Sequence, residues 1–300
     1  MSQHALHRIL ITGKHGQVGR ELVDRAEELG IDAVAFGSKE LDIRDRAAVF
    51  EALLKHQPTA VINAAAYTAV DKAEQEKESA YAVNRDGVEN LALACKVQDT
   101  PLIHISTDYV FDGEKKEPYV ETDTPNPTSI YGSSKLAGEI ALQNIWYKHI
   151  ILRVSWVFGE HGNNFVKTML RLAKDRDELG VVGDQFGAPT YAADIAAALI
   201  TMAESTVNTF NERHFGTYHF SGAPHVSWSQ FAEVIFDKAS EQKILACPPK
   251  INTITTSDYP TPAKRPANSK LDVGLVTKDF GIEASDWQKA LDNIKVYITK

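Results

Sequence analysis

A glycine-rich turn near the N-terminus constrains the fold of this chain more than any other feature. The β-rich run His7–Thr12 is followed directly by Gly13-Lys14-His15-Gly16-Gln17-Val18-Gly19, and a helical pattern begins at Val18. Glycines at this spacing allow a tight turn, close backbone approach to a pyrophosphate and close helix–strand contact. The helix N-terminus adds free N–H groups and partial positive charge. The turn therefore predicts a dinucleotide site that uses Gly13, Gly16 and Gly19.

The first half of the chain alternates between strand and helix patterns. After the first strand, further strands are expected at Asp32–Phe36, Ala60–Asn63, Leu102–Ser106 and His149–Val154. Helices are expected between them at Val18–Leu29, Arg44–His56, Lys72–Val97 and Tyr131–Ile145. Such alternation favours right-handed βαβ units and a parallel sheet with helices on both faces. We predict an α/β protein with a Rossmann-type, doubly wound parallel sheet, and residues 1–154 as its dinucleotide-binding domain.

The second half is less regular. Helical runs at Asn164–Lys174, Ala192–Glu204 and Ser227–Ala239 are separated by loops rich in Gly and Pro. Residues 155–300 are predicted to form mainly a smaller C-terminal α/β substrate domain, with part of 187–215 returning to the first domain. The stretch Pro248–Pro266 holds five of the twelve prolines and is expected to wrap over the surface.

Composition narrows the choice of partners and compartment. The formal net charge is −8 and no long basic run occurs, so neither nucleic acid nor a membrane surface is an expected partner. The two cysteines, Cys95 and Cys247, lie far apart, as free thiols in a reducing compartment would. The histidines lack metal-binding spacing, so no metal is predicted and no divalent cation is implied. Without a long apolar run, the protein is expected to be soluble and cytoplasmic.

The end of the second predicted strand bears on the choice of cofactor. An acidic residue there would bond the ribose 2′-hydroxyl of NAD, whereas a cation would suit the 2′-phosphate of NADP. Here Ser38 and Lys39 follow the strand, and no acid occurs before Glu40. We therefore expect NADPH, although NADH could serve and Lys39 could be an ordinary solvated lysine.

A tyrosine and a lysine four residues apart begin a predicted helix. Tyr131 and Lys135 fall on one helical face, where an ammonium can lower the pKa of a phenol and bring it toward useful acid–base catalysis. Thr107 ends the preceding strand, followed by Asp108 and Tyr109, and the carboxyl ends of parallel strands are where such sheets hold ligands. Thr107 could bond a substrate carbonyl oxygen, or could simply be a β-branched strand residue.

Together these motifs resemble the extended short-chain dehydrogenase/reductase family and, within it, the dTDP-4-dehydrorhamnose reductases. The resemblance runs through nearly the whole chain in order. Beyond the glycine turn it is carried by Asn63–Glu74 (NAAAYTAVDKAE), Ser106–Gly113 (STDYVFDG), Tyr131–Glu139 (YGSSKLAGE), Gly162–Leu172 (GNNFVKTMLRL), Asp184–Thr190 (DQFGAPT) and Tyr259–Asp272 (YPTPAKRPANSKLD).

The resemblance implies roles for individual residues. Thr107, Tyr131 and Lys135 would be catalytic, and Tyr131 and Lys135 would also contact the cofactor. Further cofactor contacts would come from Gln17, Val18, Asp42, Ile43, Ala65, Ala66, Tyr67 and Thr68, where Tyr67 replaces a histidine often found in the family. Residues expected at the substrate are Thr107, Asp108, Tyr109, Trp156, Asn163 and Arg265.

Several of these residues have plainer explanations. Trp156 could be a core residue, Asn163 could belong to a helix cap, and Arg265 could be a surface arginine rather than a partner of the substrate diphosphate. For Asp71 and Glu74 we favour the simple interpretation that they are carboxylates at a helix start.

The implied activity is NADPH-dependent reduction of the 4-keto group of dTDP-4-dehydro-6-deoxy-L-mannose to dTDP-L-rhamnose, for cell-surface polysaccharide. The partner is then a dTDP-sugar, and the protein could be a homodimer. Two alternatives stay open at this point. One is a dinucleotide-binding regulatory subunit related to the partner of methionine adenosyltransferase. The other is a reductase or epimerase that acts on another dTDP-deoxysugar.

Overall fold

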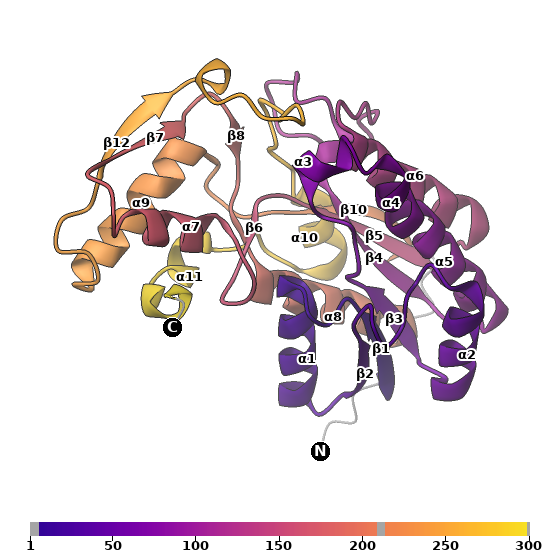
Figure 1. Cartoon of the computed structure of the whole chain (residues 1–300). Coiled ribbons are helices and arrows are strands. Elements are labelled where there is room, and N and C mark those ends of the chain that lie inside the picture. Colours follow the sequence, from indigo (N-terminus) through magenta and orange to yellow (C-terminus); the bar gives the residue numbers. More distant parts are fainter. Residues whose placement is uncertain (1–5, 209–213, 299–300) are drawn as a thin grey trace.

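A six-stranded parallel sheet forms the centre of the computed structural model, which describes residues 6–208 and 214–298 (Figure 1). The strand order is β10-β5-β4-β3-β1-β2. The strands are β1 (Arg8–Thr12), β2 (Asp32–Phe36), β3 (Ala60–Asn63), β4 (Leu102–Thr107), β5 (His149–Val154) and β10 (Gly216–Phe220). The five strands predicted from the sequence are all present, and β10 is a sixth that the sequence analysis missed.

Helices cover both faces of this sheet, which explains why its central strands are apolar on both sides. One face packs against α1 (Gln17–Leu29) and α8 (Ala192–Asn208), whose Leu22 and Leu199 belong to one buried cluster. The other face packs against α2 (Arg46–His56), α5 (Gly87–Val97) and α6 (Ile130–Ile145). Gly30 ends α1 in the left-handed conformation at φ +69°. The predicted α/β, Rossmann-type doubly wound architecture is confirmed.

The single helix predicted at Lys72–Val97 is wrong. The chain instead forms α3 (Val70–Ala73), α4 (Lys77–Tyr81), a π-helical turn η1 (Ala82–Asp86) and then α5. The break between α3 and α4 comes where Asp71 and Glu74 turn to tertiary partners. The π turn lies against α6, where a Cβ added to Gly138 would come within 2.0 Å of the Asn84 carbonyl oxygen. Tertiary contacts therefore override a continuous helical pattern.

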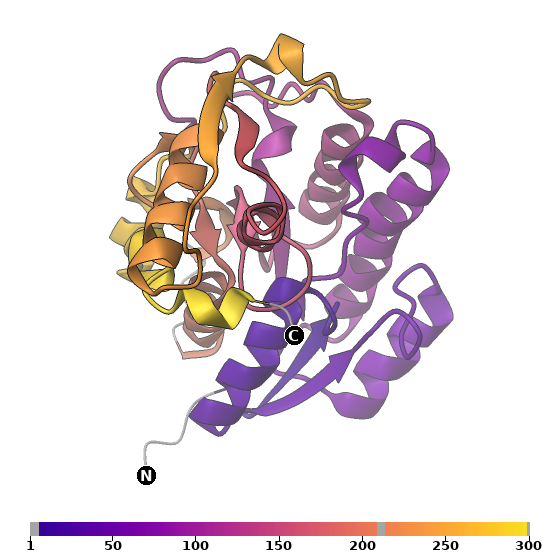
Figure 2. The same cartoon turned by 60° about the vertical axis from the view of Figure 1, so that its left-hand side comes forward.

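The remaining elements gather to one side of the large sheet, as both views show (Figure 2). They comprise α7 (Phe165–Leu172), α9 (Trp228–Glu241), α11 (Trp287–Ala290) and the short paired strands β6 (Val157–Phe158) with β9 (Thr190–Tyr191), β8 (Phe186–Gly187) with β11 (Val226–Ser227), and β7 (Glu178–Val182) with β12 (Lys250–Ile254). Helix α10 (Gly274–Phe280) lies beside β10 of the large sheet. Helices α7 and α9 share a second buried core around Phe231 and Trp287. Helix α10 instead packs Val276 into the core of the large sheet.

Two expectations about this half need adjustment. The proline-rich stretch 248–266 does more than wrap over the surface, because β12 within it pairs in parallel with β7. Of the segment 187–215 that we expected to return to the first domain, residues 209–213 lie outside the described part of the chain. The division of the chain near residue 154 stays a prediction. Across the described ranges, none of the helices is both long and apolar enough to cross a membrane.

Candidate active site

The predicted site lies where the carboxyl ends of β1, β3 and β4 meet. The strand register places Thr12 beside Asn63, and Asn63 beside His104. The glycine turn follows β1, the run Ala64–Ala66 follows β3, and Thr107 is the last residue of β4. Three segments that are far apart in the sequence therefore converge at one edge of the sheet, where open parallel sheets bind their ligands.

The glycine turn has the geometry that a dinucleotide needs. Gly13 has φ +78°, and a Cβ there would lie 2.6 Å from the Ala64 carbonyl carbon. A Cβ on Gly19 would come within 2.1 Å of the Gly13 carbonyl oxygen, so this glycine is required for close helix–strand contact. Gly16 is exposed and, as N-cap of α1, offers no side chain to cap its first N–H groups. Those N–H groups can bind a pyrophosphate.

The residues after β2 present a cation and a hydroxyl to solvent. Ser38 and Lys39 are both exposed. The nearby Glu40 accepts hydrogen bonds from Lys14 (2.5 Å) and from the Gly37 N–H (2.7 Å), and the Lys14 contact keeps the pKa of Glu40 below its ordinary value. The acidic residue of this turn is therefore already engaged by protein donors, which fits a 2′-phosphate better than a 2′-hydroxyl.

Asp42 and Ile43 differ in what they can offer a cofactor. The Asp42 carboxylate is bound by the Arg44 guanidinium at 2.6 Å, which lowers its pKa. The Ile43 side chain is buried in the core, where a Cβ on Gly87 would come within 2.6 Å of it. Its carbonyl oxygen accepts from the Asn90 amide at 3.0 Å. The described contacts of Ile43 are thus with α5.

The segment after β3 is held by two buried asparagines. Asn63 Oδ1 accepts from the Ala65 N–H at 3.1 Å, beside Ala66. Asn84 Oδ1 accepts from the Tyr67 N–H at 2.8 Å, while its Nδ2 donates to the Tyr67 carbonyl at 3.1 Å. The Tyr67 hydroxyl turns outward to Glu76, and Thr68 is exposed. Sequence reasoning missed Asn84, because only the π turn directs its side chain to this segment.

Thr107, Asp108 and Tyr131 form a buried polar group at the end of β4. The Thr107 hydroxyl donates to Asp108 Oδ1 at 3.1 Å, while Asp108 Oδ2 is buried and has no described partner. Burial raises the pKa of Asp108 to about 6. It also raises the pKa of Tyr131, and a hydrogen bond with Thr107 acts in the opposite direction. Tyr131 therefore enters a reaction as a protonated phenol, which suits a proton donor.

Lys135 lies one helical turn after Tyr131, and its side chain is buried. Its Nζ donates to the Ile105 carbonyl oxygen at 2.7 Å and lies 3.3 Å from His104 Nε2. Burial lowers the pKa of Lys135 to about 8, although the Glu139 carboxylate opposes this. We expected this lysine to lower the pKa of Tyr131, but the largest influence on that pKa is burial, which raises it.

A segment from the C-terminal half reaches this site. Arg265 Nη2 donates to Asp71 Oδ2 at 2.6 Å, and Asp71 Oδ1 accepts from the Ala263 N–H at 3.2 Å. Burial raises the pKa of Tyr109 to about 12, and the Arg265 charge opposes this shift. The Tyr109 ring contacts that of Tyr131, with 5.5 Å between the centroids. Arg265 Nη1 is buried with no described partner. Asp71 lies in the first turn of α3, as expected, and its carboxylate makes these tertiary contacts in addition. Glu74 is instead at the C-cap of α3 and accepts from the Ile130 N–H at the start of α6.

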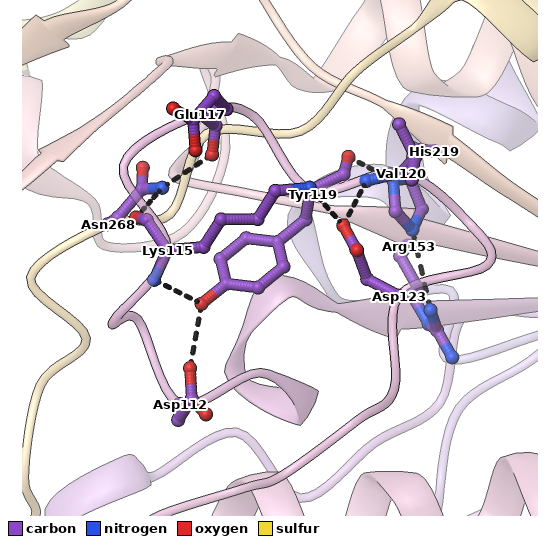
Figure 3. A network of polar contacts seen from close by, with 9 residues as sticks. All are labelled: Asp112, Lys115, Glu117, Tyr119, Val120, Asp123, Arg153, His219 and Asn268. Carbon is purple, nitrogen blue, oxygen red and sulfur yellow. Dashed lines mark hydrogen bonds and ion pairs between the residues drawn. The ribbon is translucent and has the colours of Figure 1, made fainter.

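The same segment is held to the loop that follows β4 (Figure 3). Asn268 Nδ2 donates to the carbonyl oxygens of Lys115 (2.6 Å) and Glu117 (2.9 Å). Tyr119 donates through its hydroxyl to Asp112 at 2.8 Å, and its carbonyl accepts from buried His219 Nδ1 at 3.0 Å. The two Asn268 bonds hold the segment that carries Arg265 against this loop.

Two predicted substrate residues occupy different surroundings. Trp156, at φ +46°, stacks on Trp228 with 3.5 Å between ring centroids. Asn163 is exposed and lines a cavity with Lys167 and Arg171, away from Tyr131. Its neighbour Asn164 caps α7 and donates to Gln17 Oε1 at 2.9 Å, so it is Asn164 that contacts the helix after the glycine turn.

A separate cavity of about 780 Å³ lies between α8 and the C-terminal segment. Its lining includes Tyr191, Asp194 and Ser285, and none of the residues that the sequence analysis assigned to the site. Thr107, Tyr131 and Lys135 therefore lie outside this cavity.

Comparisons with known proteins agree with the motifs. The family model described as RmlD substrate binding domain matches residues 7–297. A dTDP-4-dehydrorhamnose reductase of Aggregatibacter actinomycetemcomitans is 53% identical over 97% of this chain and 99% of its own length. One from Escherichia coli K12 is 42% identical over 93% of this chain and 94% of its own. The crystal structure of the Bacillus anthracis dTDP-4-dehydrorhamnose reductase in complex with NADP superposes with a TM-score of 0.89, at 35% identity, covering 97% of this chain and 99% of that one.

Proposed function

Because this chain belongs to the RmlD substrate binding domain family, we propose that it reduces the 4-keto group of dTDP-4-dehydro-6-deoxy-L-mannose to give dTDP-L-rhamnose, with NADPH as reductant. The product would be a precursor of cell-surface polysaccharide. The observation that carries this proposal is the buried Tyr131 phenol beside Thr107, with Lys135 one turn away, at the same sheet edge as the glycine turn.

The residues of the chain fit the cofactor and divide the work of the reaction. When bound, NADPH would supply the hydride that reduces the keto carbon. The glycine turn and the first turn of α1 would hold its pyrophosphate, with Ser38 and Lys39 near the 2′-phosphate. Thr107 would orient the ketone, and Tyr131 would donate its proton to the carbonyl oxygen. The resulting phenolate must then regain a proton, and Lys135, one helical turn away on α6, would supply it.

The position of Arg265 favours a substrate that carries a diphosphate. Its Nη1 is buried without a described partner, and a guanidinium can bind phosphate oxygens through two N–H groups at once. Tyr109 and Asp108 line the same end of β4 and would face the sugar. We place Trp156 at the sugar as well, with its Trp228 stack as the supporting surface.

The direct test replaces Tyr131 by Phe. We expect Tyr131→Phe to lose at least about a hundredfold in kcat, because it removes the proton donor, while the Kd for NADPH stays within about twofold. NADPH oxidation with the 4-keto sugar nucleotide measures the first quantity, and quenching of protein fluorescence measures the second. Turnover close to that of the unmodified protein would contradict the assignment.

The same assay separates the alternatives. NADPH binding without oxidation of the cofactor, by the unmodified protein with any dTDP-4-keto sugar, would favour a dinucleotide-binding regulatory subunit. Oxidation that gives the C4 epimer, identified by NMR of the product, would indicate a different reductase of the same class.

The wider setting is proposed on the same basis. Residues 1–154 would bind the dinucleotide and residues 155–300 mainly the sugar nucleotide. Cys95 and Cys247 are free thiols, which supports a reducing compartment and therefore the cytoplasm. A homodimer is the assembly that we would test first, by light scattering.

A further inference from the structure

A chain of buried polar side chains lies behind Lys135. Thr12 Oγ1 donates to Asn63 Oδ1 at 2.6 Å, Asn63 Nδ2 lies 2.9 Å from His104 Nδ1, and His104 Nε2 lies 3.3 Å from Lys135 Nζ. The first three residues come from the neighbouring strands β1, β3 and β4, and all four side chains are buried. Of the four, only Lys135 is part of the predicted site.

The orientation of Asn63 is fixed by a backbone donor. Asn63 Oδ1 accepts from the Ala65 N–H at 3.1 Å, and a backbone N–H can only donate. The amide nitrogen of Asn63 must therefore face His104 Nδ1. Since that amide nitrogen is itself a donor, Nδ1 must accept and carries no proton.

The orientation of Asn63 decides the tautomer of His104. Burial holds the pKa of His104 well below its ordinary value, and the Lys135 charge lowers it further, so the ring is neutral. A neutral ring with an unprotonated Nδ1 carries its proton on Nε2. That N–H points at Lys135 Nζ.

The contact between His104 Nε2–H and Lys135 Nζ is favourable for the neutral amine and unfavourable for the ammonium. A neutral amine can accept from His104 Nε2–H while donating to the Ile105 carbonyl. An ammonium has no lone pair, so it would face the same N–H as donor against donor. The arrangement therefore stabilises the amine relative to the ammonium.

We propose that His104, held in its Nε2–H tautomer by Asn63, is a positioning residue that makes the Lys135 ammonium a stronger acid. The inference rests on the proposed function, in which Tyr131 loses a proton to the carbonyl oxygen in each turnover. An O–H bond of Tyr131 breaks as the product hydroxyl forms, and the phenolate then takes a proton that an N–H of Lys135 gives up. Water returns a proton to the Lys135 amine.

The other charged and titratable groups around this pair act in known directions. On α6, Glu139 opposes the loss of the Lys135 proton, but Arg153 of β5 neutralises it at 2.6 Å. Tyr131 stays protonated because it is buried. On β5, His149 is hydrogen-bonded to the Trp146 carbonyl. Its charge lowers the pKa of His104 and is not among the influences on the pKa of Lys135. Of the two groups in contact with Lys135 Nζ, the Ile105 carbonyl accepts a hydrogen bond from the ammonium, whereas the neutral His104 ring directs an N–H at it.

The first experiment tests the tautomer without any turnover. In ¹⁵N-histidine-labelled protein, two-bond ¹H–¹⁵N spectra distinguish a pyridine-type from a pyrrole-type nitrogen, and the His104→Gln spectrum identifies the residue. We expect Nδ1 of His104 to be pyridine-type and Nε2 pyrrole-type. A protonated Nδ1 would overturn the proposal, whatever the enzyme does.

The second experiment measures the pKa of Lys135 from its ¹³Cε resonance, assigned by its loss in Lys135→Met. We expect His104→Leu to raise this pKa by about one unit, because the opposing N–H is gone. Asn63→Asp should also raise it, since a carboxylate accepts from Nδ1–H and turns an unprotonated Nε2 toward the lysine.

Two controls separate this effect from loss of structure. His104→Gln can accept from Asn63 and donate to Lys135, so it should keep the pKa near that of the unmodified protein. His149→Gln changes a buried histidine on the adjacent strand and should leave the pKa unchanged. If Lys135 titrates alike in His104→Leu and in the unmodified protein, His104 has no such role.

Turnover supplies the last readout. In the His104→Leu variant the decline of kcat at high pH should move upward by about the same amount as the Lys135 pKa, because Lys135 keeps its proton to higher pH. His104→Gln should leave that decline in place. If the unmodified protein fails to turn over at all, the proposed function fails, while the two NMR results still decide the role of His104.

Discussion

Glu139, one helical turn after Lys135 on α6, forms a buried ion pair with Arg153 of β5. Arg153 Nη2 donates to Glu139 Oε2 at 2.6 Å, and both side chains are at most 4% exposed. Arg153 also donates to His219 Nε2 at 3.4 Å and lies over the Phe111 ring. A buried charge is tolerated only beside an opposite charge, because moving an ion from water into the protein interior costs several kcal/mol of free energy.

Glu139→Gln should therefore destabilise the fold by about 3–5 kcal/mol, since it leaves the Arg153 guanidinium buried without a counter-charge. Urea unfolding followed by circular dichroism measures the change. Asp99→Asn, which removes the exposed partner of Lys148, is the matched control and should cost less than about 1 kcal/mol. Equal losses in the two variants would show that burial does not set the energy of the Glu139 pair.

Individual residues of the site differ in how far they were predictable. Tyr131 and Lys135 follow from a four-residue spacing on one helix, which is a local property of the chain. His104 has no such signal, because its partner Asn63 is 41 residues away and meets it only through the strand register. In the sequence it is one polar residue inside an apolar strand.

Among the elements, the crossing of α6 over the π turn depends on one missing side chain. Gly138 lies where a Cβ would be 2.0 Å from the Asn84 carbonyl oxygen, and that atom belongs to backbone that cannot rotate away. The same turn carries the Asn84 side chain, which holds Tyr67 and donates to Ser134 at 2.9 Å. Helix packing and the cofactor wall are thus linked through η1.

Gly138→Ala should separate these helices and cost roughly 3 kcal/mol or more, although alanine is the better helix former. Thermal unfolding gives the stability, and the Kd for NADPH should weaken because Tyr67 moves with Asn84. Asn144→Ala, at an exposed position of the same helix, should leave both values nearly unchanged. A stabilised Gly138→Ala protein would mean that the helices are not in close contact here.

Over the whole molecule, the C-terminal half is tied to the sheet edge by residues 263–272. Asp71 binds Arg265 and Ala263 across more than 190 positions of sequence. Asn268 ties the same segment to the loop after β4, and Tyr119 exchanges backbone hydrogen bonds with Lys270 and Asp272. The position of Arg265 therefore depends on contacts between the two halves of the chain.

Asn268→Ala removes two of these hydrogen bonds and should loosen the segment by about 1–2 kcal/mol. We expect KM for the dTDP-sugar to rise roughly fivefold or more, because 1.4 kcal/mol corresponds to a factor of ten. NADPH binding should be unaffected, since the glycine turn lies elsewhere. Asn252→Ala on β12, whose amide binds exposed Glu178, is the control. A rise in the Kd for NADPH with unchanged KM for the sugar would contradict this division of labour.

Patterns within a few residues of sequence were enough to predict the central architecture of this protein. The glycine spacing, the alternation of strand and helix and the Tyr131–Lys135 pair are all set within a few residues, because turns and helices are local structures. The breaks in the predicted 72–97 helix, the strand β10 and the pairing of β12 with β7 depend on packing partners far along the chain. So do the Asp71–Arg265 contact and the tautomer of His104, since strand register and buried hydrogen bonds exist only once distant segments meet.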